Sequence, residues 1–212
     1  MDGPGMPQLT ARQLTGVVIA GITVSMAVPL VIWLTKAPAR FTSELLGITP
    51  GALDIPWAWL LAAATVIGYV RYTFWAVPSV KEAATSLNLL KLAAIPLALV
   101  SGTLEELVFR KFLMDWLDSH GVAAGLQILA TALAFGLAHS VWMLFARDAQ
   151  IFVPVVASTT AMGGVLGATY LVGNRIALPV ILAHVAINLV IEPGLLLSSI
   201  TGAWKHPRHV SP

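Results

Sequence analysis

Apolar stretches of about 20 residues, separated by short polar joins, run through most of this 212-residue chain. A helical stretch of that length crosses a hydrocarbon core about 30 Å thick. We therefore predict an all-α fold, a polytopic transmembrane helix bundle with about six spans. The predicted spans cover residues 14–35, 57–77, 89–118, 122–145, 151–172 and 176–200.

The composition agrees with burial in lipid, because 58% of the residues are hydrophobic and only 10% are charged, whereas about a quarter are charged in a soluble domain. We predict a single transmembrane domain over residues 14–200. A flexible N-terminal arm over residues 1–13 and a polar C-terminal tail over residues 201–212 would flank it. The lipid bilayer is then the main partner of the protein surface.

Several chemistries are excluded at this stage. The chain has no cysteine, so it has no disulfide framework, thiolate nucleophile or cysteine-ligated zinc. Its formal net charge of +2 is spread along the loops, without the dense basic cluster that nucleic-acid binding requires. We therefore expect no nucleic-acid partner.

An even number of spans places both termini on one side of the membrane. Cytoplasmic loops carry an excess of Lys and Arg, and the charge bias favours the side that holds the termini. We expect a multi-pass protein of the cell membrane, cytoplasmic or inner, with both termini in the cytoplasm. The cations on that side would be Arg12, Arg71, Lys81, Lys91, Arg147, Lys205 and Arg208, against Lys36, Arg40, Lys111 and Arg175 opposite.

The few ionisable side chains inside the spans fall on three predicted helices at similar depth. Glu105 lies 13 residues before the turn at Asp118, His139 lies 18 residues after Gly121, and His184 lies 11 residues after Gly173. At 1.5 Å per residue these are depths of about 20, 27 and 16 Å. Intramembrane ionisable residues are costly and generally functional, so one layer of them predicts an active or ion-conducting site.

Helical spacing separates the two adjacent glutamates. Glu106 and Arg110 are four residues apart, which favours a salt bridge along one helix face. Glu105 is about 100° around the helix, and its carboxylate is free to face elsewhere. A buried carboxylate and an imidazole such as that of His139 can deprotonate a water molecule.

A second set of polar groups would complete this chemistry. His184 and Asn188 share a helix face by the same spacing of four. An imidazole and an amide N–H can stabilise the oxyanion that develops on an attacked carbonyl. These residues therefore provide a water-activating pair and oxyanion donors, the groups that peptide hydrolysis without a covalent intermediate requires.

Three motifs in this region resemble those of the CPBP family, the CAAX-protease and bacteriocin-processing membrane endopeptidases, also called the Abi family. E-E-x-x-x-R stands at 105–110, F-x-x-x-H at 135–139 and H-x-x-x-N at 184–188. The resemblance covers roughly residues 89–195, which we take as the catalytic core. It implies an intramembrane endopeptidase that hydrolyses a peptide bond of a membrane-associated protein or peptide.

The resemblance also implies roles for individual residues. Glu105 and His139 would activate water, and His184 and Asn188 would form the oxyanion site. The supporting residues would be Glu106, Arg110 and Phe135. We expect no cofactor and no metal, because H-E-x-x-H is absent and asparagine is a poor zinc ligand. Two histidines with a glutamate could still ligate zinc, so a metal site remains the alternative.

Two other functions are compatible with the same residues. A transporter or proton-relay protein also carries intramembrane carboxylates and histidines, although the chain has no internal repeat. A non-catalytic immunity or scaffolding protein could share the fold. Of the residues outside the motifs, we expect His120, His206 and His209 to be solvated, and Glu192 to lie at the membrane–water interface beside Pro193.

Overall fold

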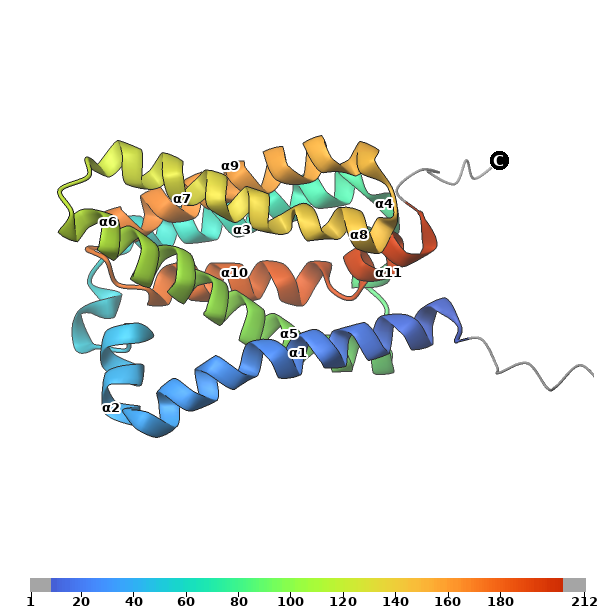
Figure 1. Cartoon of the computed structure of the whole chain (residues 1–212), viewed down its shortest axis with the longest axis horizontal. Coiled ribbons are helices and arrows are strands. Elements are labelled where there is room, and N and C mark those ends of the chain that lie inside the picture. The colour runs from blue at the N-terminus through green and yellow to red at the C-terminus, as the bar shows by residue number, and fades with distance from the viewer. Residues whose placement is uncertain (1–8, 204–212) are drawn as a thin grey trace, which may run out of the picture.

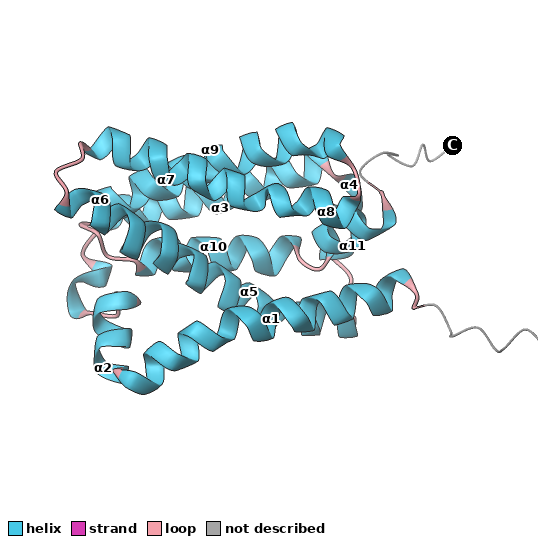
Figure 2. Ribbon diagram, viewed as in Figure 1, coloured by secondary structure: helices cyan, strands magenta, loops and turns pink. Residues whose placement is uncertain are grey.

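The computed structural model describes residues 9–203, which are almost entirely helical and contain no strand (Figure 2). Four helices are long and apolar enough to cross a membrane, and there are up to six spans if each of two bent helix pairs counts as one. The prediction of an all-α polytopic bundle with about six spans is therefore confirmed. Residues 1–8 of the predicted arm and 204–212 of the predicted tail, with His206 and His209, lie outside the described residues.

The helices follow one another with short connections. Those of the first half are α1 (Ala11–Lys36), α2 (Pro38–Arg40), η1 (Phe41–Leu45), η2 (Pro50–Leu53), α3 (Pro56–Ala76), α4 (Pro78–Ala84) and α5 (Leu89–Glu106). Those of the second half are η3 (Leu107–Met114), α6 (Asp115–Ser119), α7 (Ala124–Ala138), η4 (His139–Val141), α8 (Trp142–Ala146), η5 (Ala149–Ile151), α9 (Phe152–Val172), α10 (Leu178–Ile191) and α11 (Gly194–Thr201).

The first helix begins inside the segment that we predicted as a flexible arm. Thr10 caps α1 by accepting a hydrogen bond from the Gln13 backbone, and the Gln13 side chain accepts one from the Thr10 backbone. This reciprocal capping satisfies backbone donors of the first turn, so the helix starts at Ala11. The start of α1 and the end of α11 lie at the same end of the bundle (Figure 1).

The long helix that carries Glu105, α5, is continuous although it contains a proline and a glycine. It continues through Pro96 and Gly102 and then changes to a π-helix, η3, directly after Glu106. Gly102 marks a close helix contact instead, because a Cβ atom there would lie 2.8 Å from the backbone nitrogen of Val185 on α10. π-helical turns often occur at functional sites, and this one begins directly after the two glutamates and contains Arg110.

The last predicted span is bent by 50° between α10 and α11. The break falls at Glu192 and Pro193, and proline cannot supply the N–H that would continue the helix. The ammonium of Lys91, on α5, donates to the freed carbonyls of Leu189, Val190 and Glu192 at 2.6, 2.9 and 2.6 Å. Our expectation for Glu192 was wrong: the turn draws it into the protein, where it is only 6% exposed.

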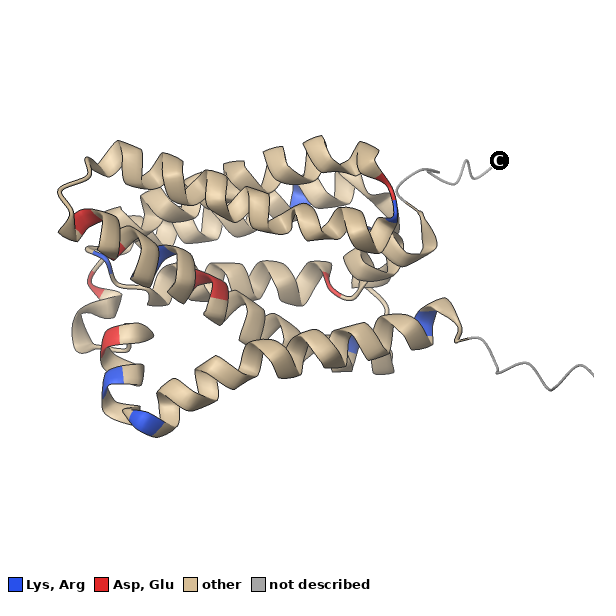
Figure 3. Ribbon diagram, viewed as in Figure 1, with Lys and Arg blue, Asp and Glu red and all other residues tan. Residues whose placement is uncertain are grey.

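Packing around α10 brings the motif-bearing helices together. α10 lies in the middle of the bundle and contacts α5 on one side and α3 on the other (Figure 1). α7 packs closely on α9, since a Cβ atom at Gly136 would overlap the Thr160 hydroxyl and lie 2.8 Å from the Val156 carbonyl. Charged residues gather toward the two ends of the bundle, and few lie near its middle (Figure 3).

Candidate active site

The three motifs meet at the centre of the bundle. Glu105 and Glu106 form the last turn of α5, Arg110 follows on η3, and Phe135 and His139 lie at the junction of α7 and η4. His184 and Asn188 lie on α10. The structure therefore places all seven predicted site residues in one cluster, as their matched depths suggested.

A buried ion pair forms the base of the cluster. Glu106 Oε2 lies 3.0 Å from Arg110 Nε, and both side chains are completely buried. The guanidinium also donates from Nη2 to the carbonyl of Gly163 at 3.1 Å and lies 4.8 Å from the centre of the Phe135 ring. The ion pair predicted from the spacing of four is present, and α9 and α7 supply its other contacts.

Glu106 has a second partner that the sequence did not reveal. Its other oxygen, Oε1, lies 2.7 Å from Nδ1 of His184 on α10. An ionised carboxylate only accepts hydrogen bonds, so Nδ1 carries the hydrogen and Nε2 is the ring nitrogen that faces Glu105. Glu106 thus fixes both the arginine and the orientation of this imidazole.

The two imidazoles face the same carboxylate. Glu105 Oε2 lies 3.5 Å from Nε2 of His139 and 4.0 Å from Nε2 of His184. His139 Nδ1 lies 2.8 Å from the carbonyl of Phe135, and because a carbonyl only accepts, Nδ1 carries the hydrogen. The Nε2 atom of each ring is therefore directed toward Glu105, while the other nitrogen is held by the protein.

Phe135 orients these groups through its ring. It is fully buried, and its centroid lies 4.4 Å from that of His139 and 5.7 Å from that of His184, the latter in an edge-on arrangement. Edge-on and tilted aromatic contacts contribute about 0.5–1.5 kcal/mol each beyond area burial. Because the ring contacts His139, His184 and Arg110, it limits the rotamers that these three side chains can adopt.

Ser101 forms a second polar contact between α5 and α10, besides that of Glu106 with His184. The Asn188 amide donates from Nδ2 to Ser101 Oγ at 3.1 Å. Ser101 precedes Glu105 by four residues, and Asn188 follows His184 by four, so the two antiparallel helices contact at successive turns. Sequence reasoning missed Ser101, although a polar residue one turn before Glu105 on an apolar helix was the available signal.

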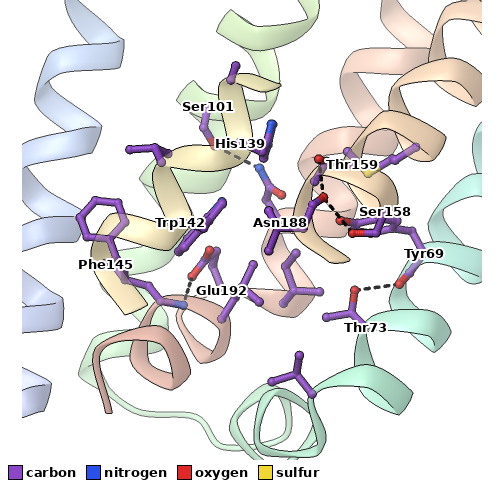
Figure 4. Close-up of a pocket in the computed structure, with 18 of the residues that line it drawn as sticks. Tyr69, Thr73, Ser101, His139, Trp142, Phe145, Ser158, Thr159, Asn188 and Glu192 are labelled. Carbon is purple, nitrogen blue, oxygen red and sulfur yellow. Dashed lines mark hydrogen bonds between the residues drawn. The ribbon is translucent and has the colours of Figure 1, made fainter. Parts of the chain in front are cut away.

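A cavity of about 880 Å³ opens onto these residues. Glu105, His139, His184 and Asn188 line it, together with Ser101 and many apolar and aromatic side chains. Figure 4 shows the ring of His139 and the amide of Asn188 near one another at this cavity. A cavity of this size accommodates an extended peptide segment of several residues, or a ligand of a few hundred Å³.

The most suitable metal-ligand atoms would be the two Nε2 atoms and Glu105 Oε2. No group of three His, Asp or Glu side chains within residues 9–203 has the geometry of a metal site. The expectation that the protein works without a metal stays a prediction.

Comparison with known proteins gives one match. The family model described as "Type II CAAX prenyl endopeptidase Rce1-like" matches residues 87–190, the segment that carries all three motifs. No curated protein and no solved structure matches the chain. The match confirms the resemblance inferred from the motifs. Residues 87–190, slightly under half of the chain, are thus similar to Rce1-like type II CAAX prenyl endopeptidases; the match is consistent with a protease of the CPBP family and supports a CAAX-type intramembrane protease in general.

Proposed function

We propose that this protein is an intramembrane endopeptidase of the glutamate type, which cleaves a membrane-associated protein or peptide with water activated by Glu105 and His139. The observation that carries the proposal is the position of Glu105 Oε2, which is buried beside the Nε2 atoms of two imidazoles at the wall of a large cavity. The family's printed name refers to prenylated CAAX proteins, whereas the proposal requires only a membrane-associated peptide bond.

Water activation would use the space between Glu105 and His139. Their facing atoms are 3.5 Å apart, and a water molecule at the cavity surface can contact both. Glu105 takes a proton as the water oxygen attacks the carbonyl carbon. Since Nδ1 of His139 donates to the Phe135 carbonyl, Nε2 is free to orient the water and to share the proton.

Oxyanion stabilisation would come from α10. Asn188 uses one amide hydrogen on Ser101, and its second N–H is available for the developing oxyanion. His184 donates from Nδ1 to Glu106, so when its ring is protonated Nε2–H can donate to the same oxygen. The C–N bond then breaks, and the proton held by Glu105 and His139 passes to the leaving amine. The products are a new carboxyl terminus and a new amino terminus.

Glu106 and Arg110 take no part in proton transfer in this scheme. Their ion pair is fully buried, and Glu106 acts by holding His184 in place. They are positioning residues, and Phe135 is a third.

The test compares the membrane peptidomes of cells that express the unmodified protein or the Glu105→Gln variant. Peptide products that require the carboxylate should appear only with the unmodified chain. Purified His139→Ala should lose turnover, and Asn188→Ala should lower it roughly 100-fold, as for removal of one oxyanion donor. Identical peptidomes from the two cell lines, or full activity of the His139 variant, would contradict the proposal.

A further inference from the structure

The charged groups that line the largely apolar cavity are acidic. Among its lining residues within 9–203, the carboxylates are those of Glu105, Asp148 and Glu192, and none is a lysine or arginine. Glu105 faces the two catalytic imidazoles, so its charge belongs to the proposed hydrolysis. The hydrolysis leaves no role for Glu192, which is buried at the other end of the cavity-lining face of α10.

Two neighbours of Glu192 offset part of the cost of burying its carboxylate. Oε2 accepts a hydrogen bond from the backbone N–H of Leu196, in the first turn of α11, at 3.3 Å. A helix N-terminus stabilises a negative charge. The neighbouring Lys91 ammonium adds positive potential, but it donates to three main-chain carbonyls, and no ion pair within residues 9–203 joins it to the Glu192 carboxylate.

The second carboxylate oxygen of Glu192, Oε1, can accept further hydrogen bonds. Oε1 makes no hydrogen bond to any residue in the described range 9–203, and the residue is only 6% exposed. Figure 4 shows this carboxylate among the cavity side chains, near Trp142; Glu192 directly follows the helix that carries Asn188. A buried carboxylate oxygen that lines a cavity favours a donor brought in by a ligand.

Aromatic side chains add to the attraction for a cation. Trp142 and Phe145 line the cavity from α8, and their ring centroids are 5.8 Å apart. The faces of such rings attract ammonium and guanidinium groups electrostatically. A carboxylate accompanied by aromatic rings is the chemistry that recognises a basic side chain.

We propose that Glu192 forms a subsite for a lysine or arginine side chain of the substrate. Glu192 follows Asn188 by four residues and His184 by eight, which places it about 6 and 12 Å along α10 from the oxyanion groups. An extended peptide advances about 3.3 Å per residue. The basic residue therefore lies within about four residues of the cleaved bond. This inference rests on the proposed function and specifies the substrate class that the same cavity accepts.

The test uses a host peptide found by screening membrane-inserted apolar peptides of about 20 residues for cleavage. Lysine, norleucine or glutamate is placed in turn at each of the four positions on either side of the cleaved bond. At one position lysine should raise kcat/KM over norleucine about tenfold, equivalent to about 1.4 kcal/mol, and glutamate should lower it. In Glu192→Gln the ratio of kcat/KM for the lysine peptide to that for the norleucine peptide should fall to about one.

The matched control is Glu82→Gln, which removes an exposed acid of α4 outside the cavity. This variant should keep the tenfold ratio. Equal rates for lysine and norleucine at all eight positions in the unmodified protein would overturn the inference while leaving the protease intact. That series needs no variant of Glu192, so it decides the question even if Glu192→Gln does not fold.

A binding measurement separates this inference from the proposed activity. The Glu105→Gln variant should bind the lysine peptide about tenfold more tightly than the norleucine peptide. Binding is measured by the change in tryptophan fluorescence, since Trp142 lines the cavity. If the unmodified chain cleaves no peptide in the screen, the proposed function fails; the same screened peptides, each with lysine or norleucine at its central position, are then compared for binding, and a ratio of about one overturns the cationic subsite.

Discussion

Glu106→Gln should destabilise the fold, although glutamine has nearly the same shape as glutamate. Both carboxylate oxygens of Glu106 have a partner: Oε2 forms an ion pair with Arg110 Nε at 3.0 Å, and Oε1 accepts a hydrogen bond from His184 Nδ1 at 2.7 Å. An amide has one oxygen and one NH₂ group. With the amide oxygen toward Arg110, the NH₂ group faces His184 Nδ1 and forces that ring into the other tautomer, with its hydrogen on Nε2; turned the other way, the NH₂ group faces the Arg110 N–H donor.

The energetic cost follows from the burial of Arg110. Its guanidinium is completely buried, and without the Glu106 carboxylate its favourable interactions are those with the Gly163 carbonyl, the Phe135 ring and the more distant charge of Glu105. Removing one partner of a buried ion pair generally costs about 3–5 kcal/mol. We expect Glu106→Gln to lose about that much free energy of unfolding, and also to lose activity, because His184 is no longer held.

Glu105→Gln is the matched control, one residue away on the same helix. Its side chain is 19% exposed, and within residues 9–203 its ion-pair partners are the two imidazoles, at 3.5 and 4.0 Å. This variant should unfold within about 1 kcal/mol of the unmodified protein and yet have no turnover. The double variant Glu106→Gln with Arg110→Met removes the buried charge and should recover part of the lost stability.

Unfolding of the purified variants in mixed micelles with increasing dodecyl sulfate, followed by circular dichroism, measures the stability difference. Cleavage rates are measured on the same preparations. If Glu105→Gln proves to be the unstable variant, while Glu106→Gln folds normally and does not cleave, the catalytic base has been assigned to the wrong carboxylate.

Three further predictions concern packing, capping and metals. Gly136→Ala should destabilise the protein by about 1–3 kcal/mol in the same unfolding assay, because the added methyl group meets α9. Gly164→Ala should be tolerated, since the nearest heavy atom there is 3.9 Å away. Equal stabilities of the two variants would refute this packing. Lys91→Met should cost about 1–2 kcal/mol by uncapping α10, and the exposed Lys81→Met should not; a silent Lys91 variant would contradict the capping role. Exhaustive chelation should leave proteolysis unchanged, and loss of activity that added zinc restores would show a metal enzyme.

The sequence by itself determined the fold class and most of the site. Apolar stretches of bilayer length require helices, and their spacing gave the number of spans and the shared depth of Glu105, His139 and His184. The helical period of 3.6 residues is sufficient to predict the pairing of Glu106 with Arg110. These features depend on local geometry, which the order of residues specifies.

Contacts between helices depended on the tertiary structure. The hydrogen bond from His184 to Glu106 and that from Asn188 to Ser101 join residues 78 and 87 positions apart, and no local periodicity specifies such pairs. The position of Glu192 was mispredicted for a related reason. Its place near the end of an apolar span suggested the membrane interface, but the bend between α10 and α11, held by Lys91 from α5, directs it into the cavity. Where a side chain points at a helix break is decided by the elements that pack around the break, and only the folded chain brings those elements together.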